Sequence, residues 1–314
     1  MSRSNAEITS LLKVNIAGIE MNTPVIAASG TFGFGEEYDD FVDWSTIGAI
    51  SVKGLTLEPR LGNPGRRVAE TPSGMLNSVG LQNPGVDVFV KKILPRIKRF
   101  GVPIIVNING NTVEDYARLT EILAGVMIAG IEVNISCPNT KQGCMAFGVV
   151  PETAAAVVTA VKRRTKVPVI VKLSPNVTDI TAIACAVEAA GADAISLINT
   201  LVGMAIDTNT WQPMLGNVTG GLSGPAVKPI AVHMVWQTAQ AVKIPVIGMG
   251  GITSTRDAVE FFLAGASAVQ VGTGNFLNPR VLNDIAAGLA DYLVCRDLDH
   301  VNRLVGQMKK EGCS

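Results

Sequence analysis

The chain has 314 residues, of which 47% are hydrophobic and 17% charged, so it can bury the core of one large or two smaller domains. Its 26 basic and 26 acidic residues cancel, and no basic block stands out, which argues against nucleic-acid binding through phosphate contacts. The five cysteines (137, 144, 185, 295 and 313) are odd in number and far apart, so we expect no disulfide, no bound metal and no internal iron–sulfur cluster.

No segment predicts insertion into a membrane. The longest uncharged apolar run, near residues 122–131, is too short to span a bilayer. The first residues lack the apolar core of a signal peptide and form no amphipathic anchor. We therefore expect a soluble cytoplasmic protein with no membrane contact.

Short strands dominate the predicted secondary structure. Residues 13–24 alternate between apolar and polar around Gly18, which indicates a small N-terminal hairpin. Eight apolar segments follow, and their continuous runs are typical of strands buried on both faces of a parallel sheet. These segments are residues 25–28, 48–53, 103–107, 131–136, 168–173, 194–199, 245–248 and 268–271.

Helices are expected between most of these strands. Asn111 or Thr112 can cap one of them, and its apolar face then carries residues 113, 116, 119, 123 and 126. Helices end at Ala-Gly before three strands, at 129–130, 190–191 and 264–265, where glycine can adopt the left-handed cap conformation.

Eight β/α units in a chain of this size predict a single (β/α)8 TIM barrel domain spanning residues 1–314, with an open doubly wound sheet as the alternative. Two long connections, from Gly54 to Pro84 and from Thr200 to Val227, have no predicted structure of their own. Because they follow strands, we expect both to wall a site at the carboxyl ends of the barrel strands.

Polar and reactive residues follow the fourth strand. Asn134 and Ser136 end this strand, and Cys137 and Asn139 come next on a loop with glycines at 143 and 148. Amides can bind a planar polar ligand, a thiol can serve as nucleophile or base, and the glycines would let the loop close over the ligand. The alternative is an ordinary turn with an inert, buried cysteine.

Two other groups of residues indicate an anionic ligand. Glycine runs at 248–251 and 272–274 end the seventh and eighth strands, where many barrels bind a phosphate through backbone N–H groups. Lys53 and Lys172 each end an apolar strand. Together with asparagines 107, 134 and 199 on neighbouring strand ends, they offer cations and amides to an anionic, planar molecule.

Four segments in this order resemble the dihydroorotate dehydrogenases. They are Val-Lys-Gly-Leu-Thr at 52–56, Asn-Ser-x-Gly-Leu-x-Asn-x-Gly at 77–85, Asn-Ile-Ser-Cys-Pro-Asn at 134–139 and Gly-x-Gly-Gly-Ile at 248–252, within a likeness from about Leu12 to Gly288. The loop at 137–148 is similar to that of the class 1 B-type enzymes, which couple to NAD. The membrane-bound class 2 enzymes carry an N-terminal extension and have serine where Cys137 stands.

The resemblance implies an FMN-dependent oxidation of dihydroorotate to orotate in pyrimidine biosynthesis. Cys137 would remove the proton from C5 while hydride leaves C6 for FMN N5, and Lys172 would lie by flavin N1 and O2. The implied cofactor-binding residues are Ser29, Lys53, Gly54, Asn107, Asn134, Lys172, Ile198, Gly224, Gly250, Gly251, Gly272 and Thr273. The implied substrate-binding residues are Lys53, Asn77, Ser78, Val79, Gly80, Leu81, Asn134, Asn139, Asn199 and Thr200.

NAD reduction is expected to need a partner. The sequence has no second dinucleotide-binding fingerprint, because Gly251-Ile252-Thr253 breaks the G-x-G-x-x-G pattern that begins at Gly248. The resemblance implies an electron-transfer subunit with FAD and a 2Fe-2S cluster, in a heterotetramer built on a homodimer of this chain. Cys144 stands where the family has glycine, and we do not expect it to be catalytic. Two alternatives are an A-type enzyme that reduces fumarate and a flavin-free, phosphate-binding lyase or isomerase that uses Cys137 and Lys172.

Overall fold

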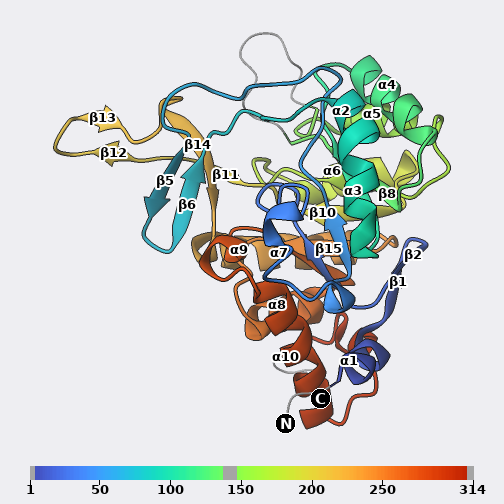
Figure 1. The fold of residues 1–314 in the computed structure, drawn as a ribbon. Helices are drawn as coiled ribbons and strands as arrows, with labels where there is room; N and C mark the ends of the chain where they lie inside the picture. Colours follow the sequence, from blue (N-terminus) through green and yellow to red (C-terminus); the bar gives the residue numbers. More distant parts are fainter. Residues whose placement is uncertain (1–3, 137–146, 310–314) are drawn as a thin grey trace.

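The computed structural model describes residues 4–136 and 147–309, and its centre is a closed barrel of eight parallel strands (Figure 1). The strands pair in sequence order, and the last one pairs with the first, which excludes the open doubly wound sheet. Each overlaps one of the eight predicted segments. They are β3 (Val25–Ala27), β4 (Ala49–Ser51), β7 (Ile104–Ile108), β8 (Gly130–Asn134), β9 (Val169–Lys172), β10 (Ala194–Leu197), β15 (Val246–Met249) and β16 (Ala268–Val271).

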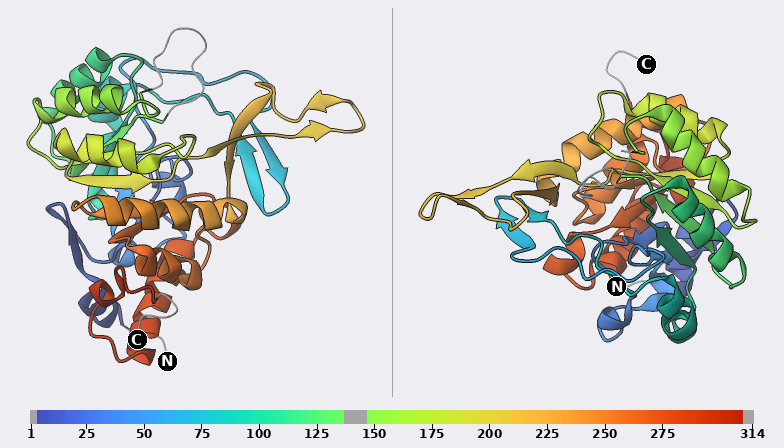
Figure 2. Two further views of the ribbon diagram at one scale, coloured as in Figure 1. Left: turned by 180° about the vertical axis from the view of Figure 1, so that it is seen from behind. Right: turned by 90° about the horizontal axis from the view of Figure 1, so that it is seen from above.

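Helices surround the barrel, as the alternating pattern predicts (Figure 2). Those of ten residues or more are α4 (Val113–Ala124), α5 (Pro151–Lys162), α6 (Ile180–Ala189), α7 (Lys228–Ala241), α8 (Thr255–Ala264) and α10 (Val281–Cys295). The shorter α2 (Val86–Val88) and α3 (Leu94–Ile97) flank a π-helical segment between β4 and β7, and α9 (Gly274–Leu277) follows β16.

Helix α4 has the predicted start but a shorter end. Thr112, rather than Asn111, is its cap: the Thr112 hydroxyl accepts a hydrogen bond from the Asp115 N–H at 3.1 Å, and the Asp115 carboxylate accepts one from the Thr112 N–H at 3.2 Å. Tyr116 lies on the buried face together with Leu119 and Leu123. The helix ends at Ala124, so the prediction that Val126 belongs to it is wrong.

Two of the three glycines expected at helix ends have the left-handed conformation. Gly191 after α6 has a φ of 98°, and Gly265 after α8 has a φ of 119°. The prediction is wrong for Gly130, which begins β8. A Cβ there would lie 2.9 Å from the Ile19 Cδ1 atom and 3.2 Å from the Pro168 carbonyl oxygen, so the close approach of the Pro168 main chain favours glycine.

The N-terminal residues close the amino end of the barrel. The predicted hairpin is confirmed as β1 (Val14–Ile16) and β2 (Ile19–Met21). Before it, α1 (Asn5–Leu12) was not predicted; it is capped by Ser4 and buries Ile8 and Leu12 beside α10 (Figure 1). No helix within the described residues is long and apolar enough to cross a membrane.

The two long connections have structure, contrary to the sequence-based expectation. Strands β5 (Val68–Thr71) and β6 (Gly74–Asn77) come from the first, and β11 (Leu201–Met204) and β14 (Thr219–Ser223) come from the second. They pair as an antiparallel sheet in the order β11-β14-β6-β5, which packs Ala69, Leu76 and Leu215 into a small second core. Strands β12 (Ile206–Asp207) and β13 (Gln212–Pro213) form a hairpin that projects outward from this sheet (Figures 1 and 2).

Candidate functional site

A pocket opens at the carboxyl ends of the barrel strands, between the barrel and the four-stranded antiparallel sheet. Its barrel side is lined by residues 28–31, 53–54, 107, 109, 134, 172, 198–200, 249–252 and 272–274. Its sheet side includes residues 75, 77, 79–81 and 221–224. The two long connections therefore wall the site as expected, because their strands pair across its mouth.

Nearly all of the predicted site residues that the structure describes line this one pocket. This holds for the whole cofactor-binding set. It also holds for Lys53, Asn77, Val79, Gly80, Leu81, Asn134, Asn199 and Thr200 of the substrate-binding set. Ser78 does not line it, and the residue is buried, with 1% of its surface exposed. Cys137, Asn139 and Cys144 lie outside the described residues.

The pocket is electrically positive. Lys53 and Lys172 both line it, and no acidic side chain does so within the described part of the chain. Burial lowers the pKa of Lys53 below its ordinary 10.5, and the positive charges of Lys172 and Arg67 lower it further. An anionic ligand would relieve this repulsion, so the electrostatics favour a carboxylate or phosphate.

Beneath the pocket lies a buried carboxylate that the sequence analysis did not single out. Glu132, in β8, is 0% exposed. One of its oxygens accepts hydrogen bonds from the Ser51 hydroxyl at 2.8 Å and the Asn107 amide at 2.6 Å. The other accepts bonds from the Ser196 hydroxyl and the Gln270 amide, both at 2.8 Å.

Glu132 is held in its charged form. Burial by itself would raise its pKa, but the positive charge of Lys172 and the hydrogen bonds from Asn107, Gln270 and Ser51 bring it below the ordinary 4.5. The only sequence signal was an acid inside an apolar strand, since the four donors come from four other barrel strands.

The amide side chains at the rim hold one another in place. The side-chain Oδ1 atom of Asn134 accepts hydrogen bonds from the Ser136 N–H at 3.1 Å and the Asn199 side-chain amide at 3.2 Å. The Asn77 amide donates to the Gly221 carbonyl across the pocket wall at 3.3 Å. Residues from the fourth strand, the sixth strand and the antiparallel sheet thus present oriented polar groups to one ligand space.

The glycines after the seventh strand form a cradle that no side chain can enter. Gly250 and Gly251 have φ values of 128° and 74°. A Cβ on Gly251 would lie 2.8 Å from both the Gly224 carbonyl oxygen and the Lys228 Cβ. Within the described residues, no backbone acceptor takes the N–H of Gly251 or Thr273. These N–H groups are suited to an anion, and the close approach explains why glycine is needed.

The described residues contain no group of three or more histidine, cysteine, aspartate or glutamate side chains that could hold a metal ion. The pocket's polar groups are instead amides, hydroxyls, backbone N–H groups and cations. They suit a ligand that is planar, rich in hydrogen-bonding groups and negatively charged.

Comparison with known proteins identifies the family. The family model described as dihydroorotate dehydrogenase matches residues 11–293. A protein of Desulforudis audaxviator named dihydroorotate dehydrogenase B (NAD(+)), catalytic subunit, is 57% identical over 300 residues, which cover 95% of this chain and 98% of that protein. Proteins with the same name from Bacteroides thetaiotaomicron and Geotalea daltonii are 57% and 55% identical over 299 residues, covering 95% of this chain and 99% and 98% of their own lengths. A family match over most of the sequence and relatives of 55–57% identity over nearly their whole length show that this chain belongs to the dihydroorotate dehydrogenase family.

Proposed function

We propose that this chain oxidises dihydroorotate to orotate, in pyrimidine biosynthesis, as the catalytic subunit of a two-subunit enzyme that reduces NAD. The observation that carries the proposal is the pocket itself, where Lys53 and the amides of Asn77, Asn134 and Asn199 converge at the carboxyl end of the barrel. A ring amide and a carboxylate are the groups that such donors and cations recognise.

FMN is the cofactor that best fits the remainder of the pocket. Gly250, Gly251, Gly272 and Thr273 line the pocket in the loops after strands seven and eight, where a phosphate would bind backbone N–H groups. The buried Thr31 hydroxyl also lines the pocket and has no hydrogen-bond partner within the described residues, so a polar ligand group would satisfy it. When bound, the flavin would accept the hydride that leaves C6 of dihydroorotate.

The chain's own residues would bind the substrate, stabilise charge and move one proton. Lys53 would pair with the substrate carboxylate, and the rim amides would orient its ring. Lys172 would stabilise the negative charge that reduction adds to the flavin at N1 and O2. The buried negative charge of Glu132 interacts with the positive charge of Lys172 from below the pocket. Cys137, on the segment outside the described residues, would take the proton from C5.

The electrons would then leave through another protein. Relatives that share 54–57% of their residues with this chain carry NAD(+) and "catalytic subunit" in their names, which supports a partner. We propose that this partner carries FAD and a 2Fe-2S cluster and joins a dimer of this chain in a heterotetramer. The five scattered cysteines of this chain could not ligate such a cluster.

An assay with different electron acceptors tests whether this chain needs a partner to reduce NAD. The purified chain should reduce an artificial dye with dihydroorotate but should not reduce NAD, and adding the partner should start the NAD reaction. Efficient NAD reduction by the chain alone would refute the two-subunit proposal. Efficient fumarate reduction would instead identify an A-type enzyme, and a colourless, flavin-free preparation would favour a lyase or isomerase.

A further inference from the structure

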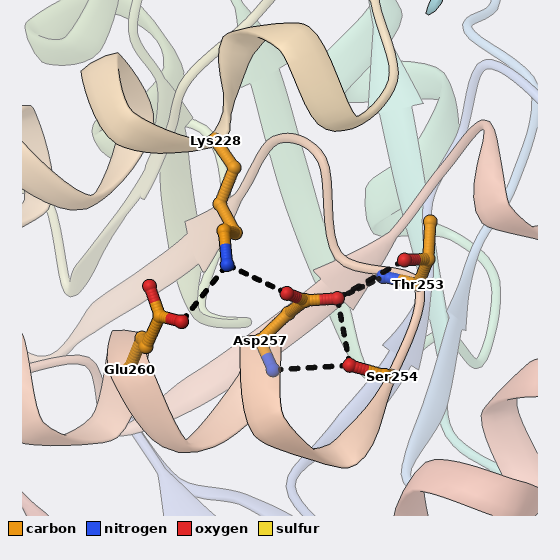
Figure 3. A network of polar contacts seen from close by, with 5 residues as sticks. All are labelled: Lys228, Thr253, Ser254, Asp257 and Glu260. Atoms are coloured by element: carbon orange, nitrogen blue, oxygen red, sulfur yellow. Dashed lines mark hydrogen bonds and ion pairs between the residues drawn. The ribbon is translucent and has the colours of Figure 1, made fainter. Parts of the chain in front are cut away.

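Lys228 lies beside the glycine cradle, yet its ammonium group is bound to two carboxylates (Figure 3). The Nζ atom is 2.7 Å from Asp257 Oδ1 and 2.8 Å from Glu260 Oε1. Lys228 is the first residue of α7, and both acids belong to α8. This ion pair therefore joins the starts of two neighbouring helices.

The same aspartate also holds the loop between β15 and α8. Its other oxygen accepts hydrogen bonds from the Thr253 N–H and hydroxyl, both at 3.0 Å, and from the Ser254 hydroxyl at 2.8 Å (Figure 3). Thr253 follows Gly250, Gly251 and Ile252, which all line the pocket. Asp257 thus links Lys228 directly to the segment that forms the cradle.

The main chain of Lys228 forms one side of the cradle. A Cβ on Gly251 would lie 3.0 Å from the Lys228 backbone nitrogen and 2.8 Å from the Gly224 carbonyl oxygen. A shift of α7 relative to α8 would therefore change the space around Gly251. Neither Lys228 nor Asp257 lines the pocket, so the ion pair lies on the other side of the loop. From there it opposes a shift of α7 relative to α8.

We propose that Lys228 and Asp257 are positioning residues that hold the Gly250–Gly251 loop in the conformation required to bind the cofactor's phosphate, and that Lys228 is not itself a phosphate ligand. This inference rests on the proposed function, in which FMN binds with its phosphate at Gly251. A lysine engaged by two carboxylates has little charge to offer an incoming anion. The phosphate would instead be bound by backbone N–H groups, whose directions depend on the loop's conformation.

The two partners remain charged together. Burial by itself would lower the pKa of Lys228, but its hydrogen bonds to Asp257 and Glu260 raise it above 10.5. Burial would likewise raise the pKa of Asp257, while Lys228, the Thr253 N–H and Ser254 bring it below 3.8. The contact therefore persists across the neutral pH range.

Two flavins that differ only in the phosphate test the proposal. The full-length, flavin-free chain is titrated with FMN and with riboflavin, and quenching of flavin fluorescence reports each affinity. In Lys228→Met and in Asp257→Asn, FMN affinity should fall about tenfold or more, equal to the loss of about one charge-assisted hydrogen bond, while riboflavin affinity stays unchanged. The asparagine can still accept the bonds from Thr253 and Ser254, so it removes chiefly the ion pair.

Lys162→Met is a matched control. Lys162 and Asp193 form a 2.7 Å ion pair, and their side chains are 30% and 33% exposed. Neither residue lines the pocket. This variant should lower the unfolding temperature without changing the ratio of FMN affinity to riboflavin affinity. If Lys228→Met does not fold, Glu260→Gln breaks only one arm of the network and should lower the ratio more weakly.

The outcomes separate three accounts. An unchanged ratio in Lys228→Met or Asp257→Asn would overturn the positioning role while leaving the proposed function intact. A higher ratio in Asp257→Asn would also overturn it, because a released Lys228 would then be binding the phosphate directly. If the unsubstituted chain bound riboflavin as tightly as FMN, the phosphate site in the proposed function would be wrong, and the positioning role with it.

Discussion

The side-chain amide of Asn107 donates a 2.6 Å hydrogen bond to the carboxylate of Glu132, and this bond connects the ligand pocket to the barrel core. Asn107 lines the pocket, whereas Glu132 is fully buried below it. The negative charge of Glu132 lies within electrostatic range of Lys172, so a group that no ligand touches contributes to the pocket's potential.

Glu132→Gln should lower the free energy of unfolding at neutral pH and make it depend less on pH in the acidic range. The folded-state pKa of Glu132 lies below 4.5, so the carboxylate stabilises the fold above that pH, and this contribution is lost as pH falls through the folded pKa. We expect a cost of about 1–3 kcal/mol at pH 7, because the glutamine NH2 group replaces an oxygen that accepts two hydrogen bonds. The serine hydroxyl of that pair can turn to accept a bond, but the amide donor is left without an acceptor unless Gln270 turns its unpaired oxygen inward.

Urea unfolding of both proteins at pH 7 and pH 4 measures this effect. The difference between the unfolding midpoints of the two proteins should shrink toward pH 4. If that difference is the same at both pH values, the pKa of Glu132 does not change on folding, and if it grows toward pH 4, Glu132 is protonated in the folded protein. Either result would contradict our assignment of its charge.

Lys53→Met should stabilise the fold while weakening substrate binding. Burial and two nearby cations lower the pKa of Lys53, so its charge costs folding free energy at pH values below the folded pKa, and that cost disappears as pH approaches 10.5. A gain of about 1 kcal/mol would raise Tm by roughly 2–4 °C at neutral pH. Orotate affinity, measured by calorimetry, should fall by about tenfold or more. A lower Tm together with unchanged orotate affinity would show that Lys53 is structural.

Gly251→Asp should abolish flavin retention, because the new side chain would collide with the Gly224 carbonyl oxygen and repel the phosphate. The matched control is Gly101→Asp. Gly101 also has a positive φ, at 69°, but a Cβ there meets nothing within 4 Å. The flavin-to-protein absorbance ratio after purification measures occupancy. A folded Gly251→Asp protein with full occupancy would mean that the phosphate binds elsewhere.

Cys137→Ser should slow dihydroorotate oxidation by orders of magnitude and move the pH optimum upward. Serine is a much weaker acid than cysteine, whose free thiol has a pKa of about 8.5, so far less of the basic form is available near neutral pH. Steady-state rates across pH would measure this, while flavin occupancy and orotate affinity should stay unchanged. Cys144→Ser should have a mild effect, and a near-normal rate for Cys137→Ser at pH 7 would exclude this thiol as the base.

The barrel could be predicted because each of its strands can be recognised from a short stretch of the sequence. Each barrel strand is a short apolar run, and the buried strands of a parallel sheet need no partner to be recognised in the sequence. Pairing between distant segments left no such signal. Asn77 of β6 pairs with Gly221 of β14, 144 residues away, so the sequence alone does not reveal the antiparallel sheet within the two long connections.

The site was partly predictable for the same reason. Lysines, asparagines and glycines at strand ends are visible in the sequence, and a closed barrel brings strand ends together. The bonds around Glu132 and the contact between Lys228 and Asp257 were not predictable, because each depends on the three-dimensional distance between different elements. The residues around Gly130 indicate a helix cap in the sequence, whereas in the structure its close packing against Ile19 and the Pro168 main chain favours glycine.

The most direct test of the account is the anaerobic mixing of the purified, flavin-loaded chain with dihydroorotate, without NAD or a partner, while the visible absorbance of the oxidised flavin is followed. We predict rapid bleaching, with one orotate formed for each flavin reduced. Absorbance that stays constant in a preparation with full FMN occupancy would contradict the claim that this chain oxidises dihydroorotate at its own pocket.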